Sequence, residues 1–570
     1  MKVLLAAVNA KYIHSNLAVY SLRAYALQRC DGICPREIEI AEYTINQPPD
    51  EILMDIYGHQ PDILCLSCYL WNIISVENLV REIPKILPGI RIWLGGPEVS
   101  YNAREMLDKY PEITGIIRGE GEETFADLMD IYHRQPDKKE NFSEVKGITY
   151  WDEEGKVVET PPQDVMDLSR IPFVYEHIED FRNRIIYYES SRGCPFSCSY
   201  CLSSIDKCLR FRDLRLVEKE VKFFIDHGVP QVKFVDRTFN CRHDHAMAVW
   251  TYIKKYDRGI TNFHFEVAAD LLNDEEIELI RSMRPGLIQL EIGVQSANER
   301  TIREIQRTMK LDQVRDRVAR IKEMKNVHQH LDLIAGLPYE GYDSFARSFD
   351  IVYDMEPEQL QLGFLKVLKG ALMHDKAEEY QLLYQDRPPY EVLSTKWLSY
   401  GELIRLKQIE EMVEVYYNSG QFRNTIKHLR KEFSSPFAMY EALAAYYREN
   451  GLFGRQYSRI ARYEILHHFI EVGKQQEYLE WLTLDLYLRD NVKNRPPFLG
   501  ENKVTKEEAS AFYRAEASER RYLKGYEGYD SRQMRKMTHL ERIGGKLILF
   551  DYQRRDALIG DARICVIENF

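Results

Sequence analysis

The first 140 residues alternate between short apolar runs and segments whose apolar residues recur at helical spacing. Val3–Val8, Ile63–Ser67, Arg91–Leu94 and Ile113–Arg118 have the length and continuous apolar character of buried parallel strands. Helical patterns such as Leu17–Gln28 separate these runs. This alternation predicts a doubly wound parallel sheet over residues 1–140.

A second alternating segment begins after a short connection. The sequence of Gly147–Pro162 is typical of a hairpin that ends in two prolines, so we expect residues 141–180 to form a hairpin linker. Residues 181–376 then contain six strand candidates, from Ile185–Ser190 to Gln359–Phe364, with helical patterns between them. Six successive strand–helix units predict a part-barrel of parallel strands.

The pattern changes again near residue 376. Long helical segments dominate between Tyr400 and Leu488, and Lys546–Tyr552 with Arg563–Glu568 could form a terminal hairpin. We therefore expect residues 377–570 to form a mainly helical C-terminal domain.

The composition indicates a soluble globular protein. Hydrophobic residues make up 45% of the 570 residues and charged residues 29%. The net charge of −12 does not favour a nucleic-acid partner, because such proteins usually have a basic surface. No apolar run approaches the roughly 20 residues of a membrane helix, so we predict a cytoplasmic protein without membrane contact. Its ten cysteines should then be mostly reduced.

Three of these cysteines form one motif. Cys194, Cys198 and Cys201 have the spacing C-x3-C-x2-C and follow the first strand of the predicted barrel, where barrels place functional loops. Three thiolates can hold three irons of a [4Fe–4S] cluster and leave the fourth iron open for a small ligand. The alternatives are buried cysteines or a zinc site, which usually pairs C-x2-C with a distant second pair. Neither alternative explains three cysteines in a single loop at a strand end.

This loop resembles that of the radical S-adenosylmethionine (SAM) superfamily, and the resemblance extends from about Ile185 to Lys376. It implies that the open iron binds the amino and carboxylate groups of SAM. One electron, supplied by an external donor such as flavodoxin or ferredoxin, then cleaves a carbon–sulfur bond and gives a 5′-deoxyadenosyl radical. Tyr200, immediately before the last cysteine, also fits the pattern of the loop.

The same resemblance implies SAM-binding residues at successive strand ends. Asp236 would accept a hydrogen bond from the SAM ammonium group, although the usual Gly-Gly-Glu motif is absent here. Glu291, Gln295 and Ser296, at the end of the fourth strand, would contact the SAM ribose. Ile334 and Gly336, at the end of the fifth strand, would contact the adenine side. The alternative to a SAM contact, for any one acidic residue, is an ordinary polar side chain at a strand end. Three matching segments at successive strand ends favour SAM binding.

The N-terminal sheet followed by this barrel resembles the cobalamin (B12)-binding subset of the superfamily. Gly95-Gly96-Pro97 matches the turn at which glycine lets the cobalamin nucleotide tail approach the backbone. The loop containing Ser67 and Leu70 is similar to one that meets the same tail. Arg118–Thr124 (RGEGEET) is a further family signature, whose acidic residues could cap the following helix.

His14 departs from the pattern of cobalt-ligating domains. These domains use Asp-x-His-x-x-Gly, whereas this chain has Tyr12-Ile13-His14-Ser15-Asn16-Leu17. The missing Asp would orient the imidazole, which puts cobalt ligation by His14 in doubt. His14 could instead line the cobalamin site or cap the following helix, and a domain that binds no cofactor is a further alternative.

Together these resemblances imply a flavodoxin-like domain, a partial (β/α)6 TIM-like radical SAM barrel and a helical extension like that of an uncharacterised, DUF4080-like branch. They imply a cobalamin-dependent radical SAM enzyme that methylates an unactivated carbon of an unknown substrate. Methylcobalamin would deliver the methyl group, and a second SAM would remethylate the cobalt. The extension would cover the barrel mouth and shape the substrate site.

Other functions stay open at this point. Related proteins perform cyclisation, rearrangement or oxidation without methyl transfer. A tRNA methylthiotransferase would need three further cluster cysteines in the first domain and a terminal β domain, which this sequence does not provide. A non-catalytic cobalamin sensor is disfavoured by the complete cysteine loop.

Overall fold

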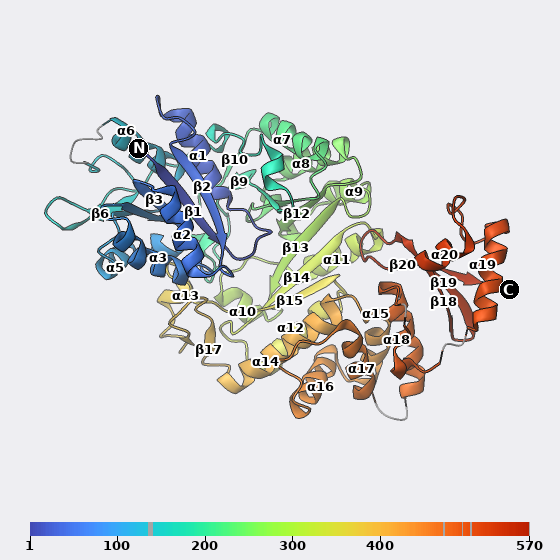
Figure 1. Cartoon of the computed structure of the whole chain (residues 1–570). Helices are drawn as coiled ribbons and strands as arrows, with labels where there is room; N and C mark the ends of the chain where they lie inside the picture. The colour runs from blue at the N-terminus through green and yellow to red at the C-terminus, as the bar shows by residue number, and fades with distance from the viewer. Residues whose placement is uncertain (135–140, 471–473, 493, 502–503, 569–570) are drawn as a thin grey trace.

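The computed structural model describes residues 1–134, 141–470, 474–492, 494–501 and 504–568. Residues 135–140, where the predicted first domain ends, lie outside the described residues. Figure 1 shows the N-terminal sheet on the left, the barrel strands in the centre, a group of helices below them and a small terminal sheet on the right.

The N-terminal sheet confirms the predicted doubly wound arrangement. Five parallel strands have the order β2-β1-β3-β4-β5, and every residue of β1 is buried. Its strands are β1 (Val3–Asn9), β2 (Ile38–Thr44), β3 (Ile63–Ser67), β4 (Arg91–Gly95) and β5 (Gly115–Ile117). Its helices are α1 (Leu17–Arg29), α2 (Pro49–His59), α3 (Ile73–Ile86), α4 (Pro97–Ser100), α5 (Ala103–Lys109) and α6 (Glu122–Arg134).

The hairpin expected within residues 141–180 is present, and it extends this sheet. Its strands β6 (Ile148–Trp151) and β7 (Val157–Glu159) are antiparallel, and β6 pairs with β5. A parallel sheet ending at the three-residue β5 would expose unpaired backbone groups, and the hairpin covers them.

The predicted part-barrel of six parallel strands is present, and its strand order is β8-β11-β12-β13-β14-β15. Along β13, fully buried residues alternate with half-buried ones, so one face packs against helices and the other lines the barrel interior. The strands are β8 (Ile186–Tyr188), β11 (Gln231–Phe234), β12 (Asn262–Val267), β13 (Ile288–Gln295), β14 (His328–Ala335) and β15 (Gln359–Phe364). The helices are α7 (Leu214–Asp226), α8 (His243–Tyr256), α9 (Asp274–Arg281), α10 (Glu299–Glu304), α11 (Leu311–Met324) and α12 (Tyr342–Tyr353).

Both edges of this open part-barrel contact neighbouring parts of the chain. Beside β8, the Ile185 backbone N–H donates to the Ile13 carbonyl at 2.8 Å, and His14 forms a parallel bridge with Ile185. Beside β15, the Asn418 side chain accepts from the Leu360 N–H and donates to the Leu360 carbonyl, both at 2.9 Å. The amide of Asn418 thus makes the hydrogen bonds that a further strand would make.

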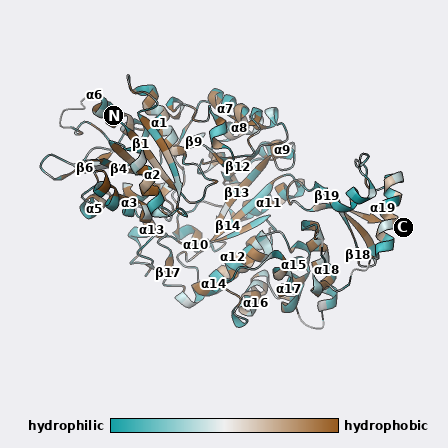
Figure 2. Ribbon diagram, viewed as in Figure 1, coloured by the Kyte–Doolittle hydropathy of each residue, from teal (hydrophilic) through white to brown (hydrophobic). Residues whose placement is uncertain are grey.

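The C-terminal helices share one hydrophobic core with the barrel. Phe349 of α12 packs against Phe437 and Tyr440 of α16, with ring centroids 5.6 and 5.9 Å apart. The segment after the barrel contains α13 (Leu372–Asp375), β16 (Leu383–Tyr384), β17 (Val392–Ser394), α14 (Tyr400–Val413), α15 (Arg423–Leu429), α16 (Pro436–Glu449), α17 (Arg459–Phe469) and α18 (Gln475–Arg489). Figure 2 shows the hydrophobic colouring concentrated on the strands of the two large sheets.

The chain ends in a small domain of helices and strands. The expected terminal hairpin exists as β19 (Lys546–Arg555) and β20 (Ala562–Ile567), but β18 (Thr538–Ile543) joins it as an unpredicted third strand. Two helices, α19 (Lys506–Glu519) and α20 (Ser531–Met537), precede these strands. Among the described residues, no helix has the length and apolar character needed to cross a membrane.

Candidate functional site

The cysteine motif lies in a loop between two short strands, β9 (Ser191–Arg192) and β10 (Arg210–Phe211). Cys194 and Cys198 are buried, and Cys201 is half-buried. The Cys194 N–H donates to the Asp206 carbonyl at 3.1 Å, and the Ser199 N–H donates to the Ile305 carbonyl at 2.9 Å. These bonds hold the loop at the carboxyl end of the first barrel strand, where the sequence predicted it.

Gly193 allows the loop to close on itself. Its φ is +92°, and a Cβ at this position would lie only 2.6 Å from the carbonyl oxygen of Cys208. Any larger residue would therefore meet both backbone strain and a backbone clash. The glycine before Cys194 brings the two ends of the loop together.

The number of thiols on this loop suits a cluster with one open iron. All ten cysteines are free. A zinc site usually draws its cysteines from two separate pairs, whereas these three lie on one loop. A three-thiolate [4Fe–4S] site, with its fourth iron open, matches this set.

Arg307 was not predicted and lies beside this loop. Its Nη1 is 3.7 Å from the Cys198 sulfur and 3.4 Å from the Tyr200 hydroxyl, and its Nη2 donates to the Gly293 carbonyl. Burial raises the pKa of the Cys198 thiol, and the Arg307 cation opposes that shift. Arg307 therefore links the cysteine loop to the end of β13 and partly offsets the effect of burial on the Cys198 pKa.

Asp236 occupies the expected strand end but is already bonded within the protein. It is fully buried, and burial raises its pKa to about 6. Its carboxylate accepts from the Ser190 N–H at 3.0 Å, the Ser190 hydroxyl at 2.7 Å and the Ser191 hydroxyl at 2.5 Å. The structure thus gives Asp236 a part in fixing the segment that leads into Cys194, and its contact with the SAM ammonium group stays a prediction.

The predicted ribose segment contains one strained and one internally paired residue. Gln295 has φ +71° at an irregularity of β13, and its buried Oε1 has no hydrogen-bond partner among the described residues. The Ser296 hydroxyl instead donates to Glu340 Oε1 at 2.7 Å. Gln295 therefore has a free acceptor suited to a ligand hydroxyl, whereas Ser296 is used to support the turn.

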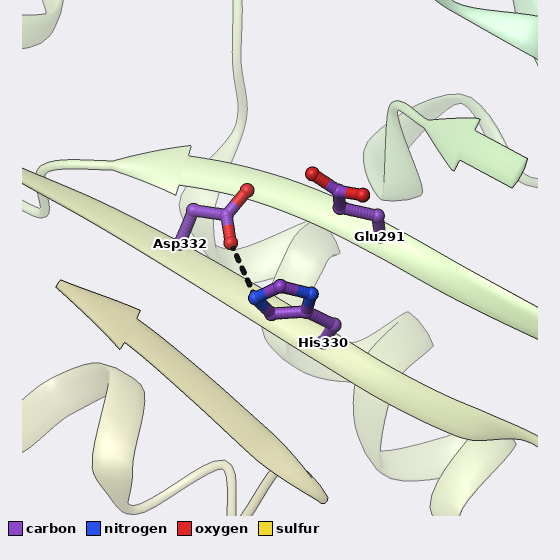
Figure 3. Close-up of side chains that lie close together, drawn as sticks. All are labelled: Glu291, His330 and Asp332. Carbon is purple, nitrogen blue, oxygen red and sulfur yellow. Dashed lines mark ion pairs between the residues drawn. The ribbon is translucent and has the colours of Figure 1, made fainter. Parts of the chain in front are cut away.

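The other predicted SAM residues lie on β13, on β14 or directly after β14. On β14, Ile334 is half-buried. Gly336, just beyond β14, has φ +91°, and a Cβ there would lie 2.8 Å from the Val392 side chain. Glu291 of β13 lies deeper in the barrel, 2.9 Å from His264 Nε2 and 3.2 Å from Lys233 Nζ. Figure 3 shows Glu291 with two other polar side chains, His330 and Asp332.

The predicted cobalamin-binding turns meet at one edge of the N-terminal sheet. The Cys68 N–H donates to the Gly95 carbonyl at 2.7 Å, and Ser67 Oγ accepts from the Asn16 amide at 3.0 Å. Gly96 has φ +125°, and a Cβ there would lie 2.4 Å from the Cys68 carbonyl oxygen. This glycine is therefore required by the neighbouring turn itself. Leu70 is half-buried, and the exposed Pro97 begins α4.

His14 reaches from the N-terminal domain to the barrel. Its Nδ1 lies 2.6 Å from the Tyr187 hydroxyl on β8. Burial, with smaller effects of Lys11 and Lys233, lowers the pKa of His14 and favours the neutral imidazole. His14 thus lies at the domain interface, and its ligation of cobalt stays a prediction.

The RGEGEET segment makes contacts that sequence reasoning missed. Glu122 begins α6 but also accepts from Arg192 at 2.7 and 3.3 Å, and Glu120 lies 3.2 Å from the same guanidinium. Arg192 further bonds Glu189 at 2.7 and 2.9 Å, and Arg210 pairs with Glu120. The only sequence signal was an acidic motif in one domain and arginines flanking the cysteine loop in another.

Comparison with known families agrees with this geometry. Residues 3–129 match the B12 binding domain, and residues 188–352 match the Radical SAM superfamily. The chain is a radical SAM protein with an N-terminal B12-binding domain. Residues 378–557 match a protein family of unknown function, DUF4080, which assigns the chain to the branch that carries this C-terminal extension.

Individual relatives are distant. The 2-(S-pantetheinyl)-carbapenam-3-carboxylate methyltransferase of Streptantibioticus cattleyicolor is 24% identical over 72% of this chain and 65% of its own length. The cobalamin-dependent radical SAM methyltransferase TokK of Streptomyces tokunonensis has the same identity and coverage. The chain thus spans slightly less than two thirds of these relatives. The solved structure of the cobalamin-dependent SAM radical enzyme OxsB, bound to aqua-cobalamin and SAM, covers 84% of this chain and 78% of its own, with a TM-score of 0.57 at 17% identity. This last likeness concerns the fold.

Proposed function

We propose that this protein is a cobalamin-dependent radical SAM methyltransferase that acts on an unactivated carbon of a small molecule. The observation that carries the proposal is the direct connection between the two cofactor regions. Arg192, two residues before Cys194, bonds Glu120 and Glu122 of the B12-binding domain. The cysteine loop and the carboxyl edge of the N-terminal sheet are therefore held against each other.

The residues assigned above divide into two sets. Cys194, Cys198 and Cys201 would hold the [4Fe–4S] cluster, with Gln295 available for SAM, and the turns at Ser67 and Gly96 would face cobalamin. Together the cofactors supply reductive cleavage of SAM and a transferable methyl group. The protein would position them, and Arg307 would favour the thiolate form of Cys198, one of the cluster ligands. An external one-electron donor completes the proposal.

The test is cofactor loading followed by SAM cleavage without added substrate. The full chain is reconstituted anaerobically with iron, sulfide and cobalamin, then given SAM and titanium(III) citrate in place of the donor. We expect iron–sulfur absorbance, 5′-deoxyadenosine, and S-adenosylhomocysteine formed together with methylcobalamin. S-adenosylhomocysteine and methylcobalamin report methyl transfer, because cyclases and other radical enzymes do not need to form these two products.

Two cysteine variants provide the matched comparison. Cys198→Ala should lose the cluster absorbance and 5′-deoxyadenosine formation, while cobalamin still binds to the other domain. Cys208→Ala removes an exposed thiol of the same loop and should keep both. If the wild-type chain forms 5′-deoxyadenosine but never S-adenosylhomocysteine, methyl transfer is wrong. If it forms neither product, the enzyme proposal fails.

A further inference from the structure

The interior of the part-barrel carries a polar cluster that the proposed radical chemistry does not use. Barrel interiors are usually filled by branched apolar side chains. Here β13 and β14 present Glu291, His330 and Asp332 to the interior. Glu291 lies directly opposite His330 in the strand register, and Asp332, two residues after His330, lies on the same face.

The three side chains converge closely. One ligand atom of each lies within 4.8 Å of the other two, and Figure 3 shows the three side chains close together, with Asp332 and His330 joined by an ion pair. His330, only 6% exposed, has its Nε2 3.0 Å from Asp332 Oδ1. Beyond this contact within the cluster, neither atom has a hydrogen bond to another described residue. Both atoms therefore keep binding capacity toward a group that enters between the three side chains.

The surrounding charges favour a cation. Glu266 of β12 lies directly opposite Glu291, and like charges across neighbouring strands are destabilising. Lys233 offsets part of this negative charge, but Lys233 and His264 both contact the same oxygen of Glu291, Oε2. A carboxylate has two oxygens that accept independently, so Oε1 remains available to a further ligand.

We propose that Glu291, His330 and Asp332 bind one divalent first-row transition-metal ion, separate from the cluster of the cysteine loop. One imidazole and two carboxylates suit ions such as Mn²⁺, Fe²⁺ and Zn²⁺. Three protein ligands also leave coordination positions open, unlike the closed sites that only support folding. The proposal gives Glu291 a role other than the expected contact with the SAM ribose.

The experiment uses Mn²⁺ as the probe and the full chain with its cluster reconstituted. Electron paramagnetic resonance of free Mn²⁺ measures uptake, and we expect about one Mn²⁺ per chain, displaced by Zn²⁺. His330→Gln and Asp332→Asn should each weaken Mn²⁺ binding at least about tenfold, because the first removes the imidazole ligand and the second removes the negative charge of the carboxylate. Lys233→Met removes the competing ammonium group and should strengthen Mn²⁺ binding about tenfold.

Controls separate a lost ligand from a lost fold. Glu299→Gln removes one exposed carboxylate on α10 and should leave Mn²⁺ uptake unchanged. Cluster iron content and helical circular dichroism should be the same in all variants. The proposal would be overturned if the wild-type chain took up no Mn²⁺, or if His330→Gln and Asp332→Asn took up as much Mn²⁺ as the wild type. Failure of the proposed methyltransferase function would appear instead as absent SAM products, with Mn²⁺ uptake unaffected.

Discussion

Glu340 illustrates how a single buried carboxyl group can make stability depend on pH. Its Oε1 accepts from the hydroxyls of Ser296 and Ser348, each at 2.7 Å, but Oε2 has no partner among the described residues. Burial raises the pKa of Glu340 from 4.5 to about 7. Between these values the folded chain holds a proton that the unfolded chain has lost. The free energy of unfolding should therefore fall as pH rises from 4.5 to 7, by at most about 3 kcal/mol, and then level off.

Replacing Glu340 tests this directly. Glu340→Gln cannot ionise, so it should lose this part of the pH dependence, measured as the midpoint of thermal unfolding from pH 5 to pH 8. The exposed carboxylate variant Glu299→Gln should behave like the wild type. An unchanged pH slope in Glu340→Gln would show that the carboxyl group is ionised throughout.

Among single residues, the sequence identified functional candidates that are close to one another along the chain. The cysteine motif spans eight positions, so its chemistry is visible without a fold. Arg307 lies more than a hundred residues from Cys198, and only the barrel brings the two together. The interior cluster left a partial signal, because polar residues alternate in His264-Phe265-Glu266 and His330-Leu331-Asp332. That alternation indicates a polar barrel face but not which strands are neighbours.

Among the elements, α15 depends on a side chain from another helix. Its N-cap residue makes no side-chain hydrogen bond. Asp485 of α18, 2% exposed, instead accepts from the N–H and side-chain groups of Asn424 and Thr425 at 2.7–3.0 Å. Asp485→Ala would leave buried donors unpaired and should lower the free energy of unfolding by about 2–4 kcal/mol in urea titrations.

Two variants sharpen this prediction for α15. Asp485→Asn keeps one acceptor oxygen and should lose less stability than Asp485→Ala. Glu477→Ala, at an exposed position of α18, should change the free energy of unfolding by less than about 0.5 kcal/mol. A loss in Asp485→Ala no larger than that of Glu477→Ala would contradict the capping role.

Elements were predicted well where one face is apolar and poorly where charges are buried. The strand β18 reads Thr-His-Leu-Glu-Arg-Ile, which lacks a clear apolar alternation. Its Glu541 has no exposed side-chain surface and is paired with Arg495 at 2.6 Å, so a partner 46 residues away makes the strand possible. For β6 and β7, the local sequence predicts a hairpin but not the sheet edge that it joins.

For the whole molecule, the contacts of Arg192 connect the cofactor domains. One guanidinium binds Glu120, Glu122 and Glu189, which a lysine cannot do because it lacks the planar fork. We expect Arg192→Lys to keep its cluster iron but to show faster hydrogen exchange in residues 118–124. Methyl transfer from SAM to cobalamin should slow about 10- to 100-fold, because misplaced reactants react slowly.

The matched control is Arg215→Lys, a change at an exposed arginine of α7. It should leave both hydrogen exchange and methyl transfer unchanged. If Arg192→Lys loses its cluster iron as well, the arginine supports the cysteine loop itself rather than the contact between domains.

The two covered edges of the part-barrel have a consequence for how such a protein can evolve. The backbone of Ile185 is bonded by residue 13, and that of Leu360 by Asn418, so the partners come from opposite sides of the barrel segment in the gene. A barrel copied alone into another gene would carry two open strand edges that invite pairing with other chains. Recombination would therefore have to transfer all three segments together, or supply a new partner for each edge.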